Sequence, residues 1–116
     1  MQYTKQQREE YNRSRALTCA NLGITENQYN WFRRIGNQLH SIYEDSCNGL
    51  IQYSENKPAE AGSYEALTEP LYEKAEAKAK SLNLYIYFQT DPRGATIYLD
   101  REPIAENAYN RASCIW

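Results

Sequence analysis

The side chains best suited to chemistry surround one predicted turn near the end of the chain. Asp91-Pro92-Arg93-Gly94 places Asp, Pro and Gly where a type I turn needs them, so turn geometry alone accounts for those three residues. It does not account for Arg93, whose guanidinium at the tip of a turn suits a phosphate beside a stacked base. The candidate ligand-binding residues are Tyr87, Phe88, Thr90, Asp91, Arg93, Gly94, Asn107 and Arg111.

Together these residue types match the inventory of a small nucleotide site. The aromatic rings would stack on a base, the arginines would bind a pyrophosphate, and Asn107 and Thr90 would reach ribose hydroxyls. Arg111 is expected to open the last strand and to add a second guanidinium near the turn. Plain surface polarity is the alternative interpretation of the same residues.

No catalytic set is visible in the sequence. His40 is the one histidine, and a general base needs an orienting partner and a nucleophile. The neighbouring carboxylates Glu44 and Asp45 diverge by about a hundred degrees around a helix axis, which suits neither a metal nor a carboxylate dyad. Paired-cysteine spacing, a Gly-rich phosphate loop and a nucleophile elbow are also missing. The sequence therefore predicts a binding protein without catalytic residues, metal or cofactor, and not an enzyme.

Composition narrows the class of protein further. The chain has 116 residues and a net charge of −2, with no basic stripe of the kind that binds a nucleic acid polymer. No apolar run is long enough for a membrane helix or a signal peptide. The odd number of cysteines, without metal spacing, indicates free thiols and a cytoplasmic location. The 11 tyrosines against 2 phenylalanines favour half-wet surfaces such as subunit interfaces or ligand pockets.

Two capping boxes predict the first two helices. Thr4 with Gln7 opens a helix that Gly23 ends, and Thr25 with Gln28 opens the next. The first half of the first helix is polar, so it is either solvated or packed on another subunit. The second helix carries an apolar stripe of Phe32, Ile35, Leu39, Ile42 and Tyr43.

A third helix is expected after Thr68, with Pro70 tolerated in its first turn. Before it, Leu50 to Tyr53 could form a short extended piece, followed by a loop rich in turn residues. The buried side of the third helix is mostly small, which predicts close packing: Leu71, Ala75, Ala79 and Leu82.

Beyond Leu84 the apolar period changes from 3.6 to 2. Two strands flank the predicted turn, and a last strand is expected from Tyr109 to Trp116. The fold class is α+β, a single domain 1–116, with N-terminal helices (about 4–82) packed on a small C-terminal antiparallel β-meander (about 84–116). The outer sheet face is too aromatic to be left in water: Tyr85, Tyr87, Thr96 and Tyr98.

Several segments resemble a family of small phage and prophage proteins. They are Leu22-Gly23-Ile24-Thr25-Glu26-Asn27-Gln28-Tyr29, Arg33-Arg34-Ile35-Gly36, Glu44-Asp45-Ser46-Cys47-Asn48-Gly49, and Gln89-Thr90-Asp91-Pro92-Arg93-Gly94 with Ile97-Tyr98. The match spans roughly residues 20 to 100. Within that group the chain is similar to anti-Thoeris proteins that act as sponges for an immune signal.

The resemblance implies an anti-defence protein in the cytoplasm of an infected bacterial host. Such a protein binds a small cyclic nucleotide ligand, a cyclic ADP-ribose isomer, and sequesters it without cleaving it. It also implies a homo-oligomer, dimer or higher, with ligand pockets between subunits. One alternative is a phage inhibitor that binds a host defence protein directly, as anti-CRISPR proteins do. An enzyme that degrades a nucleotide signal is a third interpretation.

Overall fold

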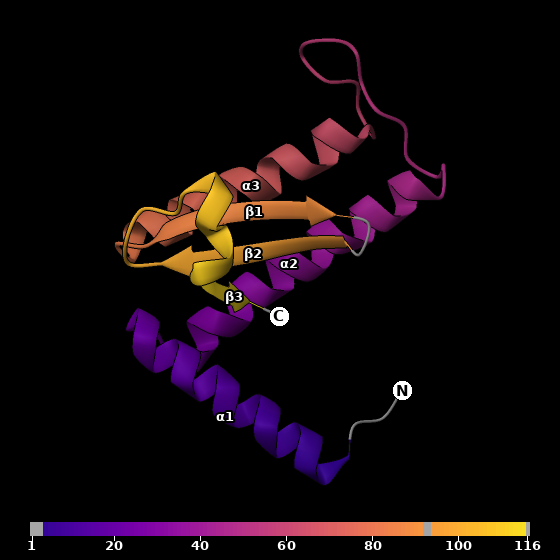
Figure 1. Cartoon of the computed structure of the whole chain (residues 1–116). Coiled ribbons are helices and arrows are strands. Elements are labelled where there is room, and N and C mark those ends of the chain that lie inside the picture. Colours follow the sequence, from indigo (N-terminus) through magenta and orange to yellow (C-terminus); the bar gives the residue numbers. More distant parts are fainter. Residues whose placement is uncertain (1–3, 92–93, 116) are drawn as a thin grey trace.

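The computed structural model describes residues 4–91 and 94–115. Helices α1 (Lys5–Leu22), α2 (Glu26–Cys47) and α3 (Tyr64–Ser81) come first. Strands β1 (Tyr85–Asp91) and β2 (Gly94–Asp100), the 3₁₀ helix η1 (Glu106–Arg111) and strand β3 (Ser113–Ile115) follow. The sheet has the order β1-β2-β3, and α2 and α3 pack against it, which confirms the α+β class (Figure 1).

Local capping determines where α1 and α2 begin. The Thr4 hydroxyl accepts the Gln7 N–H at 3.1 Å, and the Thr25 hydroxyl accepts the Gln28 N–H at 3.1 Å. In each case the glutamine side chain accepts the threonine N–H at 2.8 Å, so both predicted capping boxes are confirmed. Gly23, with a φ of 71°, ends α1 in the left-handed region that favours glycine.

The predicted start of α3 is wrong. The helix begins at Tyr64, because the Ser63 hydroxyl caps it by accepting the Ala66 N–H at 3.3 Å. Thr68 lies inside the first turns and donates to the Tyr64 carbonyl at 2.8 Å. Pro70 therefore stands inside the helix, where it removes one backbone donor. The segment from Leu50 to Tyr53 is a loop and not a strand.

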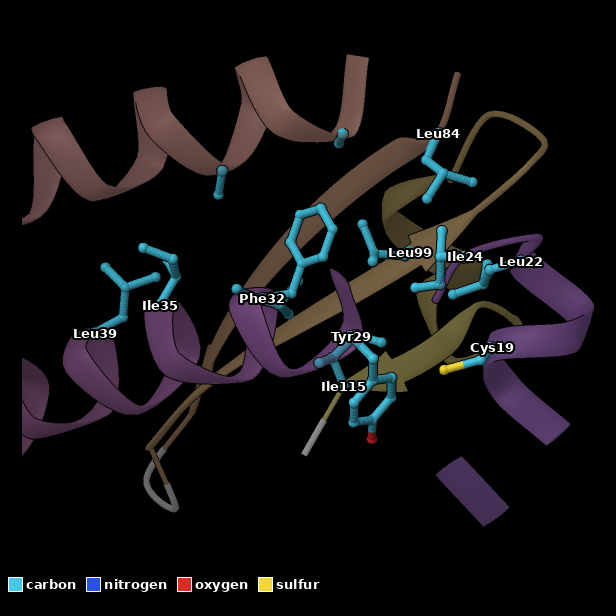
Figure 2. Packing of buried hydrophobic residues seen from close by; sticks show 13 residues of the cluster. Cys19, Leu22, Ile24, Tyr29, Phe32, Ile35, Leu39, Leu84, Leu99 and Ile115 are labelled. Carbon is cyan, nitrogen blue, oxygen red and sulfur yellow. The ribbon is translucent and has the colours of Figure 1, made fainter. Parts of the chain in front are cut away.

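The core lies between the helices and the sheet. Phe32 of α2 points between α3 and the strands, and Phe32, Ile97 and Leu99 are fully buried (Figure 2). Ala75 and Ala79 present small side chains to this core, which allows α3 to pack closely, as the sequence predicts. The remaining members of the cluster are Cys19, Leu22, Ile24, Tyr29, Ile35, Leu39, Leu84 and Ile115.

The sheet is an antiparallel meander whose third strand is shorter than expected. β1 pairs with β2 from Tyr85 opposite Asp100 to Asp91 opposite Gly94. The prediction of a strand starting at Tyr109 is wrong, because η1 takes up that segment and, of the described residues, Ser113–Ile115 pair with β2. Trp116, the predicted end of that strand, lies outside the described residues. Within the described residues, no helix combines the length and apolar character that a membrane span requires.

Candidate functional site

The predicted ligand-binding residues lie on two different faces of the sheet. Phe88 faces the helices and packs edge-to-face against Tyr72 of α3, with ring centroids 4.7 Å apart. Tyr87, its neighbour in β1, faces the opposite side, because successive residues of a strand alternate. The two rings therefore cannot hold one ligand between them.

The outer aromatic face is covered by the chain's own η1. Tyr109 stacks on Tyr87 with ring centroids 4.9 Å apart and planes 10° apart, and meets Tyr98 edge-on at 5.0 Å. These are the geometries that aromatic pairs prefer. Tyr109 thus occupies the position over Tyr87 that a nucleotide base would take. Tyr85, on the same face, keeps 50% of its surface exposed.

The polar members of the predicted set surround this face without enclosing it. Thr90 is exposed near the end of β1, and Asn107 and Arg111 are exposed on η1. Arg111 ends η1 and does not open a strand, which corrects the sequence prediction. Asp91 and Gly94 are opposite one another in the register. Arg93 with Pro92, and the side chain of Asp91, lie outside the described residues.

A second candidate site lies between α1 and the rest of the domain. It is a hollow of about 780 Å³ bounded by α1, the start of α2 and β3. Figure 1 shows α1 running below β3 and the start of α2, away from the sheet faces. We call this cavity the α1–α2 hollow, and its lining residues are Gln7, Arg8, Glu10, Tyr11, Asn12, Ser14, Arg15, Thr18, Tyr29, Arg33 and Cys114.

Helical spacing brings the α1 side chains of the hollow onto one face. Gln7, Tyr11, Ser14 and Thr18 recur at intervals of three and four residues, the period of a helix face. On most globular helices this inward stripe is apolar, whereas on the first half of α1 it is polar. Only Tyr11, Arg15 and Thr18 are partly covered between Thr4 and Thr18. This stripe therefore does not form a hydrophobic core contact.

Two arginines converge on one tyrosine ring in the hollow. The guanidinium carbon of Arg33 lies 5.4 Å from the centre of the Tyr11 ring, and that of Arg15 lies 5.6 Å from it. Both distances are within the range of a cation–π contact. α1 supplies Tyr11 and Arg15, while the turn at Gly23 brings α2 back so that Arg33 reaches the same ring.

Arg15 is held in place and retains unused hydrogen-bonding capacity. Its Nη2 donates to Asn12 Oδ1 at 3.2 Å, and its Nε lies 3.7 Å from Glu26 Oε1. The Nε atom is buried and has no hydrogen-bond acceptor, although Glu26 is close enough for an ion pair. A buried donor without an acceptor is costly, so an anion entering the hollow would be favoured there.

The lining charges favour an anionic ligand. Among the described lining residues, Arg8, Arg15 and Arg33 supply positive charge and Glu10 is the one carboxylate, while Glu26 lies outside the lining, 3.7 Å from Arg15 Nε. Cys114 also faces the hollow from β3, and burial raises the pKa of its thiol while a hydrogen bond from Tyr98 acts in the opposite direction. The thiol therefore stays protonated at neutral pH, which makes Cys114 a weak nucleophile.

Sequence reasoning missed this hollow. None of the described members of the predicted set lines it. The available signal was the polar stripe with Tyr11 and Arg15 four residues apart, where an apolar stripe would normally stand. Arg33 belongs to a different helix, and its approach to Tyr11 depends on how α1 and α2 pack, which no local pattern reports.

Other groups offer less chemistry. His40 and Glu44 are joined at 2.8 Å on the surface of α2, and this pairing of residues four apart is an ordinary surface contact. Among the residues that the structure describes, no cluster of three His, Cys, Asp or Glu could hold a metal ion.

No protein-family model, curated protein or solved structure matches this chain.

Proposed function

We propose that this protein binds a small nucleotide-like anion in the α1–α2 hollow and holds it without altering it. One observation carries the proposal: Arg15 and Arg33, from different helices, both place a guanidinium against the Tyr11 ring at the hollow. This arrangement combines two anion-binding forks with an aromatic surface, and both are needed to bind a phosphate attached to a base.

The dimensions and the remaining donors support the same ligand class. A volume of about 780 Å³ falls within the roughly 300–1,000 Å³ typical of small-molecule sites. Ser14, Thr18 and Asn12 provide hydroxyl and amide groups of the kind that bind ribose hydroxyls. The same lining would also tolerate a base, since a ring stacked on Tyr11 needs no sequence-specific hydrogen bonds.

Arg33 can turn from the tyrosine to a ligand at a net gain. A cation–π contact at an exposed site is worth about 0.5–1 kcal/mol, whereas a hydrogen bond to a charged group contributes about 1.5–3 kcal/mol. Arg33 is exposed, and within the described part of the chain its guanidinium contacts the Tyr11 ring without an added hydrogen bond or ion pair. A phosphate would therefore compete successfully with Tyr11 for the Arg33 guanidinium.

The resemblance of the sequence to anti-Thoeris sponges supports a more specific form of the proposal. The ligand would be a cyclic ADP-ribose isomer, and the protein would act in the infected bacterial cell by withholding that signal from its effector. Sequestration needs tight binding and no reaction. A nanomolar Kd corresponds to about −12 kcal/mol, which several charged bonds and one stacked base could approach if water is excluded.

Calorimetric titration with a panel of cyclic ADP-ribose isomers tests this function. The expected result is tight binding of at least one isomer, followed by recovery of the unaltered ligand after the protein is denatured. Arg15→Gln should weaken binding, while Arg13→Gln, on the exposed side of α1, should not. Altered ligand would indicate an enzyme. If no isomer gave a heat of binding, the protein would not bind the proposed ligand.

Cys114 provides an independent report on where the ligand sits. Cys114 lines the hollow, and replacing exposed Cys47 by serine removes the accessible competing thiol. In that Cys47→Ser background, bound ligand should slow alkylation of Cys114 by a maleimide. If binding is tight and alkylation is unaffected, the ligand occupies another surface, and the hollow is excluded while nucleotide binding stands.

Direct binding to a host defence protein is the second candidate function. The observation that favours it is the exposed first half of α1, where Lys5 to Glu10 are uncovered and lie apart from the sheet (Figure 1). Leu17 on the same helix is 64% exposed. A pull-down from host lysate separates the two functions, since an inhibitor of this kind retains a protein and a sponge retains a nucleotide.

A further inference from the structure

The outer edge of β1 is unpaired and carries no feature that blocks pairing. In the sheet order β1-β2-β3, β1 has β2 as its one neighbour within the described residues. An edge strand directs the N–H and C=O groups of alternate residues away from its neighbour. From Tyr85 to Asp91 the strand contains no proline, lysine or arginine, whereas β3 at the opposite edge is only three residues long. The β1 edge is therefore open to a further strand.

The flank of α3 forms a wall beside this edge. At the start of β1 lies a groove of about 530 Å³ whose lining includes Lys80 of α3 with Tyr85 and Ile86 of β1. Farther along the strand, Tyr72 of α3 packs against Phe88. α3 and β1 therefore run side by side in opposite directions (Figure 1). A strand added at the edge would contact both the β1 backbone and the flank of α3.

Charges of opposite sign are separated along this flank. Lys80 shares one helix face with three glutamates that stand four, seven and eleven residues before it, Glu76, Glu73 and Glu69. All four side chains are exposed, and none makes an ion pair or a side-chain hydrogen bond with another described residue. The flank is thus acidic along most of β1 and basic beside the start of the strand.

We propose that an extended, basic segment of another protein adds to the β1 edge as a fourth strand, antiparallel to β1. Lysine or arginine side chains at its alternate positions face the three glutamates of α3. Because the antiparallel direction brings its carboxyl end to the start of β1, an acidic group there meets Lys80. Strand addition supplies affinity through backbone hydrogen bonds, and the side chains at every second residue supply specificity.

The spacing of the charges fits such a strand. Glu69 and Glu76 are seven residues apart, which is about 10.5 Å along a helix axis. Alternate residues of a strand are about 6.6–6.8 Å apart, so two or three basic side chains on one face cover this span. Complementary charges of this kind speed association and reject partners of the wrong sign. The wall therefore selects a basic segment, while the β1 backbone holds it.

A second copy of β1 does not match this wall. The strand has no basic residue to face the glutamates, and its one charged residue is Asp91. A homo-oligomer of the kind that the resemblance implies would therefore use another surface. The α1–α2 hollow also lies elsewhere, because it borders β3 at the opposite edge of the sheet. The strand site thus goes beyond the nucleotide proposal and supplies a partner chemistry for the second candidate function.

Fluorescence anisotropy with synthetic peptides tests strand addition. The probe is a short labelled peptide that alternates lysine with valine and ends in glutamate, titrated with the full chain. We expect saturable binding at micromolar concentration, and no binding of a peptide in which glutamate replaces every lysine. Binding of the acidic peptide, or no binding of the lysine peptide, would overturn the proposal.

Backbone methylation separates strand pairing from simple charge attraction. Two versions of the lysine peptide carry N-methyl groups either on the lysines or on the valines, and both keep the charge. Since one of these two sets of amides faces β1, one version should bind about ten-fold more weakly than the other. Equal affinities of the two versions would show that the peptide does not pair as a strand.

Charge reversal on α3 tests the wall. Glu73→Lys/Glu76→Lys should weaken binding of the lysine peptide by about ten-fold. The control Glu9→Lys/Glu55→Lys makes the same change in net charge at exposed positions away from the groove, and it should bind nearly as the wild type does. Far-ultraviolet circular dichroism checks that both variants fold. Equal losses in the two variants would mean nonspecific attraction and would refute the site.

Lys80→Ala tests the direction of the added strand. It should weaken the peptide that ends in glutamate by about two- to five-fold and leave unchanged the same peptide ending in amidated glutamine. Equal effects on both peptides would rule out the antiparallel direction. The nucleotide titrations are independent of these results. Peptide binding without nucleotide binding excludes the hollow alone, and the reverse result excludes the strand site alone.

Discussion

The α1–α2 hollow and the outer face of the sheet both combine tyrosines with arginines, but the chain treats them differently. On the outer face, Tyr109 folds back onto Tyr87 and Tyr98 and covers them. In the hollow, the guanidiniums of Arg15 and Arg33 lie against the Tyr11 ring, and a volume of about 780 Å³ stays open beside it.

This difference shows that a group of aromatic side chains is not in itself a binding surface. Exposed aromatic area is unfavourable in water, and a short segment of the same chain can cover it at little entropic cost when it is close in sequence. η1 follows β2 directly and does so on the outer face. In the hollow the inward stripe of α1 is polar, so no hydrophobic gain drives α1 to close over it.

The largest effect is expected from a residue at the centre of the core. Phe32 is fully buried between α2, α3 and the sheet, so Phe32→Ala should lower the free energy of unfolding by about 3–5 kcal/mol. Urea denaturation monitored by circular dichroism measures this free energy of unfolding, with Leu50→Ala at an exposed position as the control. A midpoint that barely moves would mean that the core has been misassigned.

Arg33→Gln tests directly whether the nucleotide binds in the hollow. Loss of one charged hydrogen bond should weaken nucleotide binding by about 1.5–3 kcal/mol, roughly 10- to 100-fold in Kd, while loss of the contact with Tyr11 should lower stability by no more than about 1 kcal/mol. Arg34→Gln is the matched control, because Arg34 is the adjacent arginine and does not line the hollow. Equal losses in both variants would indicate a general charge effect in place of a site.

Tyr109→Ala tests the outer face of the sheet as the alternative binding surface. It removes two aromatic pairs, each worth about 0.5–1.5 kcal/mol, so stability should fall by about 1–3 kcal/mol. Nucleotide affinity should stay unchanged if the ligand binds in the hollow. Tighter binding after this substitution would instead show that Tyr87 and Tyr98 receive the base and that Tyr109 competes with it.

Arg111→Ala should change little. Arg111 is exposed on η1, and surface substitutions of this kind alter stability by about 0.5 kcal/mol or less. The same titration of Arg93→Ala tests the original sequence prediction at the hairpin. An affinity loss of about 1.5–3 kcal/mol in either variant would mean that the ligand binds at the hairpin region and not in the hollow.

The smallest effect concerns the thiol that borders both regions. Burial raises the pKa of Cys114, so the folded protein holds this proton more tightly than the unfolded chain does. Alkylation by iodoacetamide should be slow at neutral pH and should accelerate as pH rises toward the raised pKa. Stability should decline slightly over the same rise. A rate equal to that of the urea-unfolded chain would contradict this expectation.

The elements predicted well are those whose signals lie within a few neighbouring residues. The capping boxes at Thr4 and Thr25, the α2 stripe through Phe32 and the alternation of β1 are each read from adjacent positions, and each is confirmed. The α3 boundary failed at Ser63 because two competing caps lie close together in sequence. The β3 prediction failed because a packing contact made by Tyr109 outweighs the local strand pattern.

By itself, then, the sequence determined the order of helices and strands, the α+β class and the side of each element that faces the core, because periodicity and capping are local. Tertiary structure alone decided that Tyr109 covers Tyr87 on the outer sheet face and that Arg33 meets Tyr11. Each of these outcomes depends on the packing of segments distant along the chain, where many weak contacts are balanced together and no short pattern records the result.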